Sequence, residues 1–417
     1  MSNPVDLPET ASVIGGGPAG LIAAEQLAAA GVAVTVYDHK PSLGRKFLLA
    51  GRGGLNITHS EPSPAFLARY GRAPGQLAAA LEAFGPDDLR EWCAGLGEPT
   101  FVGSTGRVFP ESFRATPLLR AWLRRLGEFG VRSVTRTRWL GWAPDGSNRF
   151  ATDDGVEFVV DSDVTVLALG GASWPRVGSD GSWVAPFEAA GITVNRLRPA
   201  NVGVRVEWSQ AFVDRHEGQP LKNVSVRAGS HEVRGDPIIT RSGLEAGPIY
   251  ALSAPIRDAL DADGMCELVF DLHPDQSVER LVERLARRRP KDSNTTWLRR
   301  SIGLHPAMIG VLREATGNML PSDSTELAQL VKRVPVRVVD TMPIDRAIST
   351  AGGVAFSELD DSLMLIRRPG TFVAGEMLDW EAPTGGYLLQ ASFSTGVAAA
   401  RGARRWGRAP GAPGRLA

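Results

Sequence analysis

A glycine run close to the N-terminus carries the first chemical signal in this sequence. The run Gly15-Gly16-Gly17-Pro18-Ala19-Gly20 fits the spacing G-x-G-x-x-G between an apolar strand and a helical pattern. In that spacing Gly15 permits a tight turn, Gly17 lets a pyrophosphate approach the backbone, and Gly20 lets the helix pack against the sheet. The free N–H groups at the start of the helix then point toward the phosphates. The run therefore predicts a dinucleotide site.

An acidic residue follows at the place that such a site requires. Asp38 comes at the end of the strand pattern Val32–Tyr37, where its carboxylate can accept hydrogen bonds from a ribose 2′-OH. The alternative is a glycine-rich turn with an incidental aspartate, which the combined spacing disfavours. Since FAD and NAD sites share these features, the choice between the two depends on later segments.

A basic, glycine-rich segment comes directly after Asp38. We read Pro41–Thr58 as a loop that suits a second contact with the pyrophosphate, or a contact with the edge of a flavin. Arg45 or Lys46 in this loop can stabilise the negative charge that develops at N1 and O2 of a reduced flavin. The alternative is an ordinary basic surface loop.

Glycines also close a strand in the middle of the chain. The apolar run Val164–Leu169 ends at Gly170 and Gly171. Because glycine has no side chain, backbone at these positions can run close to a cofactor. This is the second segment that favours FAD.

The C-terminal part of the chain supplies the third such segment. Gly375 and Glu376 follow the strand pattern Phe372–Ala374, where a carboxylate can bind the ribityl hydroxyls of FAD. Gly385 and Gly386 precede the last helix, whose first N–H groups and positive dipole end would face flavin O2. The three segments together predict FAD, held by residues from both ends of the chain.

A parallel sheet has to position these residues. The strand Ala11–Ile14, the helix Pro18–Ala30 and the strand Val32–Tyr37 form a β-α-β unit, whose strands are parallel. Helices are expected over Asp87–Gly95 and Thr116–Phe129. An antiparallel meander then returns the chain to the sheet, with strands expected over Val131–Trp142, Arg149–Thr152 and Val156–Val160. The class is therefore α/β, a Rossmann fold with a β-meander crossover.

A change of periodicity divides the chain into parts. From about Asn195 the strands alternate apolar with charged residues, and between Gln276 and Gly317 the pattern is helical and charged. A strand pattern resumes at Val334–Val339. We predict an FAD-binding domain from residues 1–195 and 336–417, interrupted by an inserted domain over 196–335, β-rich over 196–274 and helical over 275–335.

Composition excludes several functional classes. The 417 residues include 46 basic and 46 acidic side chains, so nothing in the charge balance recruits nucleic acid or an anionic membrane. The basic cluster Arg287–Arg289 is read as the solvated end of a helix. The two cysteines, Cys93 and Cys266, exclude a disulfide scaffold and a dithiol relay, and no metal site is predicted. With no leader pattern and no apolar stretch that could span a membrane, the protein is expected in the cytoplasm.

At this point the residues match a known family. The chain resembles the bacterial BaiN-like or aminoacetone-oxidase-like FAD-binding enzymes, an NAD(P)/FAD-dependent oxidoreductase family. The resemblance implies a glutathione-reductase-type FAD domain interrupted by a β-rich and a small helical segment. It implies FAD contacts at Gly15, Gly17, Gly20, Asp38, Lys46, Gly375, Glu376, Gly385 and Gly386. The matching segments are Val13–Gly20, Gly44–Thr58, Gly106–Pro110, Ala168–Gly181, Ala351–Ala355 and Phe372–Gly396.

The chain also departs from the commoner pattern of that family. Leu55 stands where many members have cysteine, and Leu388 stands where many have asparagine. The segment Ile239–Ser253 differs as well. The family names suggest aminoacetone oxidation or reduction of a bile-acid double bond, but these departures indicate a separate subfamily.

Several side chains near the predicted flavin are candidates for proton transfer or substrate binding, and each has a structural alternative. His59 is a candidate acid or base, or a surface histidine. Arg107 is a candidate anion ligand, or a partner in a salt bridge. Trp174 and Tyr387 are candidate walls of the flavin pocket, or packing residues. Gln390 is a candidate flavin contact, or a packing residue, and the inserted domain offers Thr240, Arg241 and Glu245.

The function predicted from these residues is that of an FAD-dependent oxidoreductase acting on an unidentified small organic molecule. Hydride would pass through flavin N5. No second G-x-G-x-x-G follows a later strand, so NAD(P)H would bind only transiently if it is the electron donor. The alternatives are a flavin hydroxylase of an aromatic substrate, reduced by NAD(P)H, and a non-catalytic flavin-binding redox protein. The sequence predicts no oligomeric state.

Overall fold

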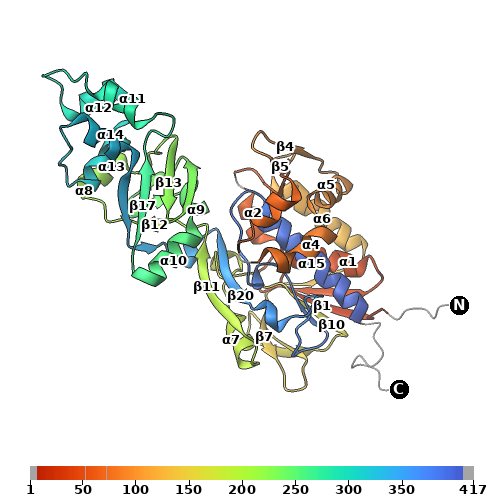
Figure 1. Cartoon of the computed structure of the whole chain (residues 1–417). Helices are drawn as coiled ribbons and strands as arrows, with labels where there is room; N and C mark the ends of the chain where they lie inside the picture. Colours follow the sequence, from red (N-terminus) through yellow and green to blue (C-terminus); the bar gives the residue numbers. More distant parts are fainter. Residues whose placement is uncertain (1–6, 52, 72, 407–417) are drawn as a thin grey trace. The chain divides into compact units, whose positions relative to one another are not determined.

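The computed structural model describes residues 7–51, 53–71 and 73–406, and the chain forms two compact units. The first unit combines residues up to Arg198 with residues from Ser349 onward. The inserted unit is Pro199–Ile348. Strands β11 (Val194–Ala200) and β20 (Ser349–Val354) pair where the chain leaves and re-enters the first unit (Figure 1).

A five-stranded sheet organises the first unit, in the order β21-β10-β1-β2-β6. All of its neighbouring strands run parallel, with β1 in the centre. The carboxyl ends of the strands therefore meet at one edge, where ligands bind in open α/β sheets. The strands are β1 (Thr10–Ile14), β2 (Ala33–Tyr37), β6 (Arg132–Val134), β10 (Val164–Leu167) and β21 (Thr371–Val373).

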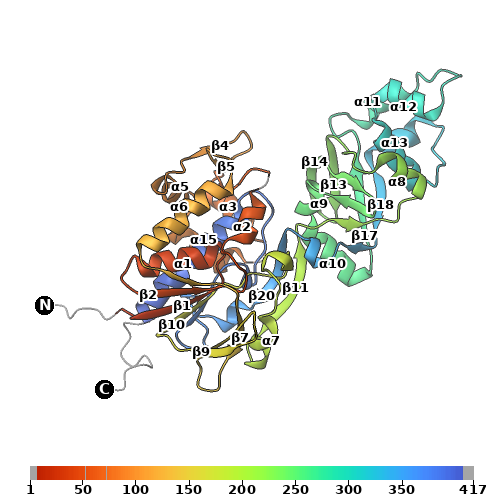
Figure 2. The same cartoon turned by 180° about the vertical axis from the view of Figure 1, so that it is seen from behind.

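Each face of the sheet is covered by a different layer. Val13 packs in a core with helices α1 (Pro18–Ala28) and α15 (Tyr387–Trp406), which lie side by side in both views (Figures 1 and 2). Ile14, the next residue, packs in a second core with the meander and its neighbours. Because successive strand residues point to opposite faces, this alternation explains why the strands are apolar throughout.

The meander differs from the prediction at its first strand. One strand was expected over Val131–Trp142, but Arg136 has a left-handed backbone (φ +55°) and divides it. Residues before the division form β6 of the parallel sheet. Residues after it begin the antiparallel meander β7 (Thr137–Trp142), β8 (Asn148–Thr152) and β9 (Glu157–Val160).

The segment predicted as the loop Pro41–Thr58 contains a helix. Helix α2 (Arg45–Ala50) is short, and its Phe47 is buried edge-on against Trp122, with ring centroids 6.5 Å apart. Tertiary packing therefore stabilises α2 where local propensity does not. The first unit also contains β3 (Thr58–His59), α3 (Ser63–Ala68), α4 (Pro74–Ala83), α5 (Pro86–Gly95), β4 (Thr100–Val102), β5 (Arg107–Pro110), α6 (Ala115–Glu128) and α7 (Val184–Ala189).

The inserted unit has its own core and two antiparallel sheets. One sheet is β15-β16-β12-β19, over Ile238–Thr240, Gly243–Glu245, Val204–Arg205 and Asp340–Thr341. The other is β14-β13-β17-β18, over His231–Gly235, Val224–Ala228, Cys266–Asp271 and Val334–Val338.

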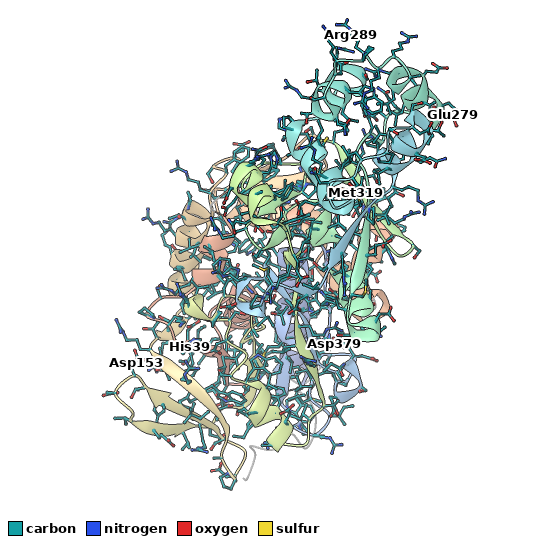
Figure 3. All side chains as sticks on the ribbon, turned by 90° about the vertical axis from the view of Figure 1, so that its left-hand side faces the viewer. His39, Asp153, Glu279, Arg289, Met319 and Asp379 are labelled. Carbon is teal, nitrogen blue, oxygen red and sulfur yellow. The ribbon has the colours of Figure 1, made fainter. Side chains whose placement is uncertain are left out.

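The inserted unit has helices in the segment predicted as β-rich as well as in the segment predicted as helical. Four of them follow one another in a run between β17 and β18. Arg289 projects to solvent beyond the helices of that run (Figure 3). The helices are α8 (Gln210–His216), α9 (Pro248–Ala251), α10 (Ser253–Asp263), α11 (Val278–Leu285), α12 (Asn294–Ile302), α13 (Pro306–Ala315) and α14 (Ser324–Lys332).

Both predicted domain boundaries shift toward the C-terminus. The first moves from 195/196 to 198/199, and the second from 335/336 to 348/349. The second shift arises because the strand pattern assigned to the returning FAD-binding domain belongs to the insertion. Strand β18 pairs with β17, and β19 pairs with β12, which are both strands of the inserted unit.

Candidate functional site

The glycine run has the geometry of a phosphate-binding turn. Gly15 has φ +107°, and a Cβ built on it would lie 2.2 Å from Ala168 O. A Cβ on Gly20 would lie 1.9 Å from Gly15 O, so both positions exclude a side chain. A Cβ on Gly17 would meet no atom of the described residues within 4 Å. The turn is therefore tight on its protein side and open at the start of α1, where a pyrophosphate has room.

Asp38 is fixed against this turn. Its Oδ2 accepts a hydrogen bond from Gly16 N at 2.8 Å, and its Oδ1 accepts one from Lys40 N at 2.7 Å. The carboxylate therefore holds the turn after β2 to the turn after β1. Each oxygen has a further lone pair for the ribose hydroxyl that the sequence predicted for it.

Lys46 joins the three segments that predicted FAD. Its Nζ lies 2.6 Å from Glu376 Oε2 and donates to Ser173 Oγ at 2.8 Å and Ser179 Oγ at 3.4 Å. Lys46 belongs to the basic segment, Ser173 follows Gly171, and Glu376 follows β21. Through these contacts Lys46 joins the segments that follow β2, β10 and β21.

Glu376 also holds backbone from two other segments. Its Oε1 accepts a hydrogen bond from Thr350 N at 2.9 Å, and its Oε2 accepts one from Gly171 N at 3.3 Å. The hydroxyl of Thr350 accepts from Ala172 N at 2.9 Å. The carboxylate predicted for the ribityl chain is therefore a hub of the site. Sequence reasoning missed Thr350, although it directly precedes the segment Ala351–Ala355 that carries the resemblance.

Gly375 and Gly170, which both have positive φ, lie next to the backbone held by Glu376. Gly375 has φ +75°, and its Cβ would lie 2.8 Å from Ala19 Cβ, so the end of β21 comes close to the start of α1. Gly170 has φ +73°, and its carbonyl accepts a hydrogen bond from Trp183 Nε1 at 2.8 Å. Arg45 lies one residue from Lys46 and donates weakly to Ser42 Oγ at 3.5 Å.

The start of α15 lies against the backbone of Thr58, in a segment that has two unpartnered polar atoms. Gly386 has φ +98°, and its Cβ would lie 2.5 Å from Thr58 O. Thr58 Oγ1 and Asn56 Oδ1 are buried and have no hydrogen-bond partner among the described residues. Gly385, with φ +133°, precedes this close approach. Since buried polar groups are nearly always paired, these atoms fit a bound polar ligand.

His59 is held by hydrogen bonds through both ring nitrogens. Nδ1 accepts from Glu61 N at 3.1 Å, so Nε2 carries the proton and donates to Thr105 O at 3.0 Å. The ring also stacks on Tyr387, with centroids 5.3 Å apart. This arrangement matches the structural alternative for His59 rather than a free acid or base.

Tyr387 is a packing residue with a polar anchor. It is 4% exposed, and its hydroxyl donates to Glu61 Oε1 at 2.7 Å. Burial raises the pKa of Tyr387, while hydrogen bonds from Arg69 and from Tyr387 lower the pKa of Glu61. Tyr70 Oη donates to Tyr387 O at 3.0 Å. This network fixes the first residue of α15, and no motif in the sequence predicted it.

The other candidates do not form part of this cluster. Gln390 is fully buried, its Nε2 donates to Phe84 O at 2.9 Å, and its Oε1 has no hydrogen-bond partner among the described residues. Arg107 is exposed on β5. Thr240, Arg241 and Glu245 belong to the inserted unit, where Arg241 pairs with Glu217 at 3.0 Å. Trp174 follows Ser173 of the cluster directly, and it is 36% exposed.

The site as a whole fits FAD. It offers an open helix start for a pyrophosphate, an acid for a ribose, and a second set of polar groups around Glu376 and Thr58. A family model described as "HI0933-like protein Rossmann domain" matches residues 9–402. The chain belongs to this family. The family is the one that the sequence motifs resemble, and the match spans both units.

Three relatives of this chain are named as a reductase or as dihydrouridine synthases. The chain is 26% identical over 94% of its length to a 3-dehydro-bile acid delta(4,6)-reductase of Clostridium scindens, and the match covers 98% of that protein. It is 23% identical over 93% of its length to a ribosomal RNA dihydrouridine synthase of Haemophilus influenzae, covering 96% of that protein. A synthase of the same name from Escherichia coli is 24% identical over 94% of the chain.

Solved structures share the fold. A flavocytochrome c3 fumarate reductase in an open conformation matches 97% of this chain and 79% of its own length, with a TM-score of 0.51 and 15% identity. A 3-ketosteroid delta1-dehydrogenase from Sterolibacterium denitrificans matches 95% of this chain and 100% of its own, with a TM-score of 0.52 and 12% identity. The predicted α/β Rossmann fold class is confirmed. The chain is an FAD-dependent oxidoreductase of the HI0933-like family. Among the helices that the structure describes, none is long and apolar enough to span a membrane.

Proposed function

We propose that this protein reduces a carbon–carbon double bond conjugated to a carbonyl group in a small organic molecule, with NAD(P)H as the electron donor. The similarity to the bile acid reductase supports this reaction, because it extends over 98% of that relative and so includes both units. When bound, FAD would supply the hydride-transfer chemistry that joins oxidation of the nicotinamide to reduction at the β-carbon of the substrate. A proton at the α-carbon completes the reduction, so that one NAD(P)H and one proton are consumed for each double bond.

The chain's own residues would bind FAD and orient it. Gly17 and the start of α1 would hold the pyrophosphate, Asp38 the adenosine ribose, and Glu376 the ribityl chain. Lys46 holds Glu376 in place through their ion pair. The start of α15 at Gly386 would present N–H groups to the flavin's pyrimidine edge, where they favour negative charge.

The proton is proposed to come from water. His59 and Tyr387 already use their polar atoms within the protein. The two cysteines are also unsuited, since burial raises the pKa of Cys93 to about 12 and raises that of Cys266. Leu55, which stands where many family members have cysteine, is fully buried and has no proton to give.

The test is a product analysis with purified, FAD-loaded protein. NADH or NADPH is supplied with a 3-oxo-4,6-diene steroid and, in parallel, with cyclohex-2-enone as a minimal enone. Loss of the double bond by mass spectrometry, with one nicotinamide oxidised for each bond reduced, supports the proposal. Insertion of an oxygen atom into an aromatic substrate instead would favour the hydroxylase alternative.

A second candidate is the reduction of uracil in RNA. Two ribosomal RNA dihydrouridine synthases match more than nine-tenths of this chain, and uracil contains a double bond conjugated to a carbonyl. Residues 275–335 also carry 11 basic and 7 acidic side chains, and Arg287 and Arg289 are exposed. The zero net charge of the whole chain favours the small molecule. Dihydrouridine formed in unmodified ribosomal RNA, measured by nucleoside mass spectrometry, would reverse the preference.

A further inference from the structure

Two large aromatic residues adopt a backbone conformation that such residues rarely take. Phe113 has φ +57° and Trp174 has φ +62°, both in the left-handed region. Their side chains are 49% and 36% exposed. Because a left-handed backbone is strained for a bulky residue, it persists where the surrounding structure holds it, and such residues cluster at ligand sites.

Phe113 completes a stack of three phenylalanines beside the β4–β5 hairpin. Its ring lies 5.3 Å from that of Phe109 at an interplanar angle of 29°, and 5.0 Å from that of Phe101. Phe101 and Phe109 are themselves stacked, with centroids 5.8 Å apart. We call these three residues the aromatic shelf. The two inner rings are half-buried, and Phe113 forms the exposed end.

The aromatic shelf contacts the loop that leads to Thr58. Leu55 N donates a hydrogen bond to Phe113 O at 3.0 Å. A Cβ on Gly54 would lie 3.4 Å from Phe113 Cδ1, in ordinary contact with the ring. The next residue, Asn56, has the buried and unpartnered Oδ1 described above. The exposed ring therefore packs on the loop that continues to Asn56 and Thr58.

A purely structural role does not account for Phe113. A ring that only completed a small core would be buried, whereas half of this one faces solvent. A turn that only needed a left-handed residue would take glycine or asparagine, which adopt that conformation with little strain. The strain and the exposure together leave one face of the ring available for a ligand.

We propose that Phe113, supported by Phe109 and Phe101, is a specificity-determining residue that stacks on the flat apolar part of the substrate. This inference rests on the proposed function and adds the substrate's shape. The preferred substrate is a conjugated carbonyl compound with an extended, planar hydrocarbon body rather than a short one. Trp174, with the same backbone signature beside Ser173, is a second ring available at the end of β10.

The variant Phe113→Asn tests the role of the ring apart from that of the left-handed backbone. Asparagine accepts the left-handed region, so this variant removes the ring without adding strain. Phe113→Leu keeps an apolar side chain without an aromatic face. The probes are 4-androstene-3,17-dione, which has an extended flat body, and cyclohex-2-enone, which does not. The readouts are FAD content, Tm, and the Kd of each probe from its perturbation of the flavin absorption bands.

For Phe113→Asn we expect unchanged FAD content and a Tm that stays level or rises. Its Kd for the steroid should rise about tenfold, because an aromatic stacking contact and its buried area are lost. Its Kd for cyclohex-2-enone should stay the same, and Phe113→Leu should lie between Phe113→Asn and the wild type. A lowered Tm with an unchanged steroid Kd would overturn the proposal and make Phe113 a structural residue.

The wild-type results distinguish this inference from the proposed function. Reduction of cyclohex-2-enone without binding of the steroid leaves the reaction intact and overturns the role of the aromatic shelf. If the wild type reduces neither probe and binds neither, the proposed function itself fails, and the inference fails with it.

Discussion

Lys46 Nζ and Glu376 Oε2 form an ion pair at 2.6 Å, although the two residues are 330 positions apart in the sequence. The Lys46 side chain is 29% exposed and that of Glu376 is 14% exposed, so solvent screens the pair only in part. Through Thr350 and Gly171, the same carboxylate holds two further segments. The pair therefore links the N-terminal part of the site to its C-terminal part.

Removing the positive charge should damage both stability and FAD retention. In Lys46→Met the carboxylate of Glu376 loses its counter-charge in a mostly buried place, which should cost about 1–3 kcal/mol of unfolding free energy. Urea denaturation and the flavin content after purification measure the two effects. Lys222→Met is the matched control, because the Lys222–Asp236 pair has a similar length of 2.8 Å but is 66% and 44% exposed. Equal losses in both variants would contradict the role given to Lys46.

A methyl group on Gly17 should block the cofactor without unfolding the protein. The Cβ of Gly17→Ala enters open space, and the backbone (φ −84°, ψ −178°) suits alanine. We expect normal Tm for the FAD-free protein and a loss of FAD affinity of at least about tenfold, since the methyl occupies the place of the pyrophosphate. Gly127→Ala in α6 is the control, because its Cβ also meets no described atom within 4 Å. FAD affinity that is equal in both variants would exclude Gly17 from the site.

Acid should weaken the network around the start of α15. Hydrogen bonds from Arg69 and Tyr387 hold the pKa of Glu61 below its ordinary 4.5. Because the folded-state pKa is the lower one, the network's stabilisation is complete above about pH 4.5 and is lost as the pH falls through the folded-state value. Glu61→Gln should therefore lower stability by about 1 kcal/mol at neutral pH and flatten the acid dependence of the unfolding free energy. Parallel pH curves for the variant and the wild type would contradict this.

His59 should be dispensable for the chemical step. Both of its ring nitrogens are engaged, so His59→Asn should change kcat by less than about tenfold, whereas loss of a general acid costs about 10²–10⁴. Stability should fall modestly because the stack on Tyr387 is removed. The pH profile of kcat decides the matter: a titration present in the wild type and missing from His59→Asn would restore His59 as the acid.

Motif spacing could predict the glycine turn at the start of α1 and the carboxylate that is fixed against it. Gly15, Gly17, Gly20 and Asp38 lie in one β-α-β unit, where backbone geometry follows directly from local sequence. The fold class and the interruption of the first unit could also be predicted, because the periodicity of the apolar residues changes where the inserted unit begins. The second domain boundary could not be predicted, since β18 has an ordinary strand pattern and only its pairing with β17 assigns it to the inserted unit.

The rest of the site depends on tertiary contacts. Lys46 and Glu376 were both predicted, but their mutual contact follows from the sheet order and from no local pattern. Thr58 and Thr350 were missed because a single threonine has no distinguishing signal until its buried surroundings are known. Tyr387 was read either as a pocket wall or as a packing residue, and its hydrogen bond to Glu61 and its burial identify the packing role.

The most direct test of the central claim is an anaerobic titration of the FAD-loaded protein followed through the flavin absorption bands. NADPH or NADH should bleach the bands, and a 3-oxo-4,6-diene steroid added afterwards should restore them in the absence of oxygen. A protein that shows no flavin bands after reconstitution with FAD would contradict the assignment of the site. Flavin that is reduced by nicotinamide but is not reoxidised by any conjugated carbonyl compound would contradict the proposed reaction.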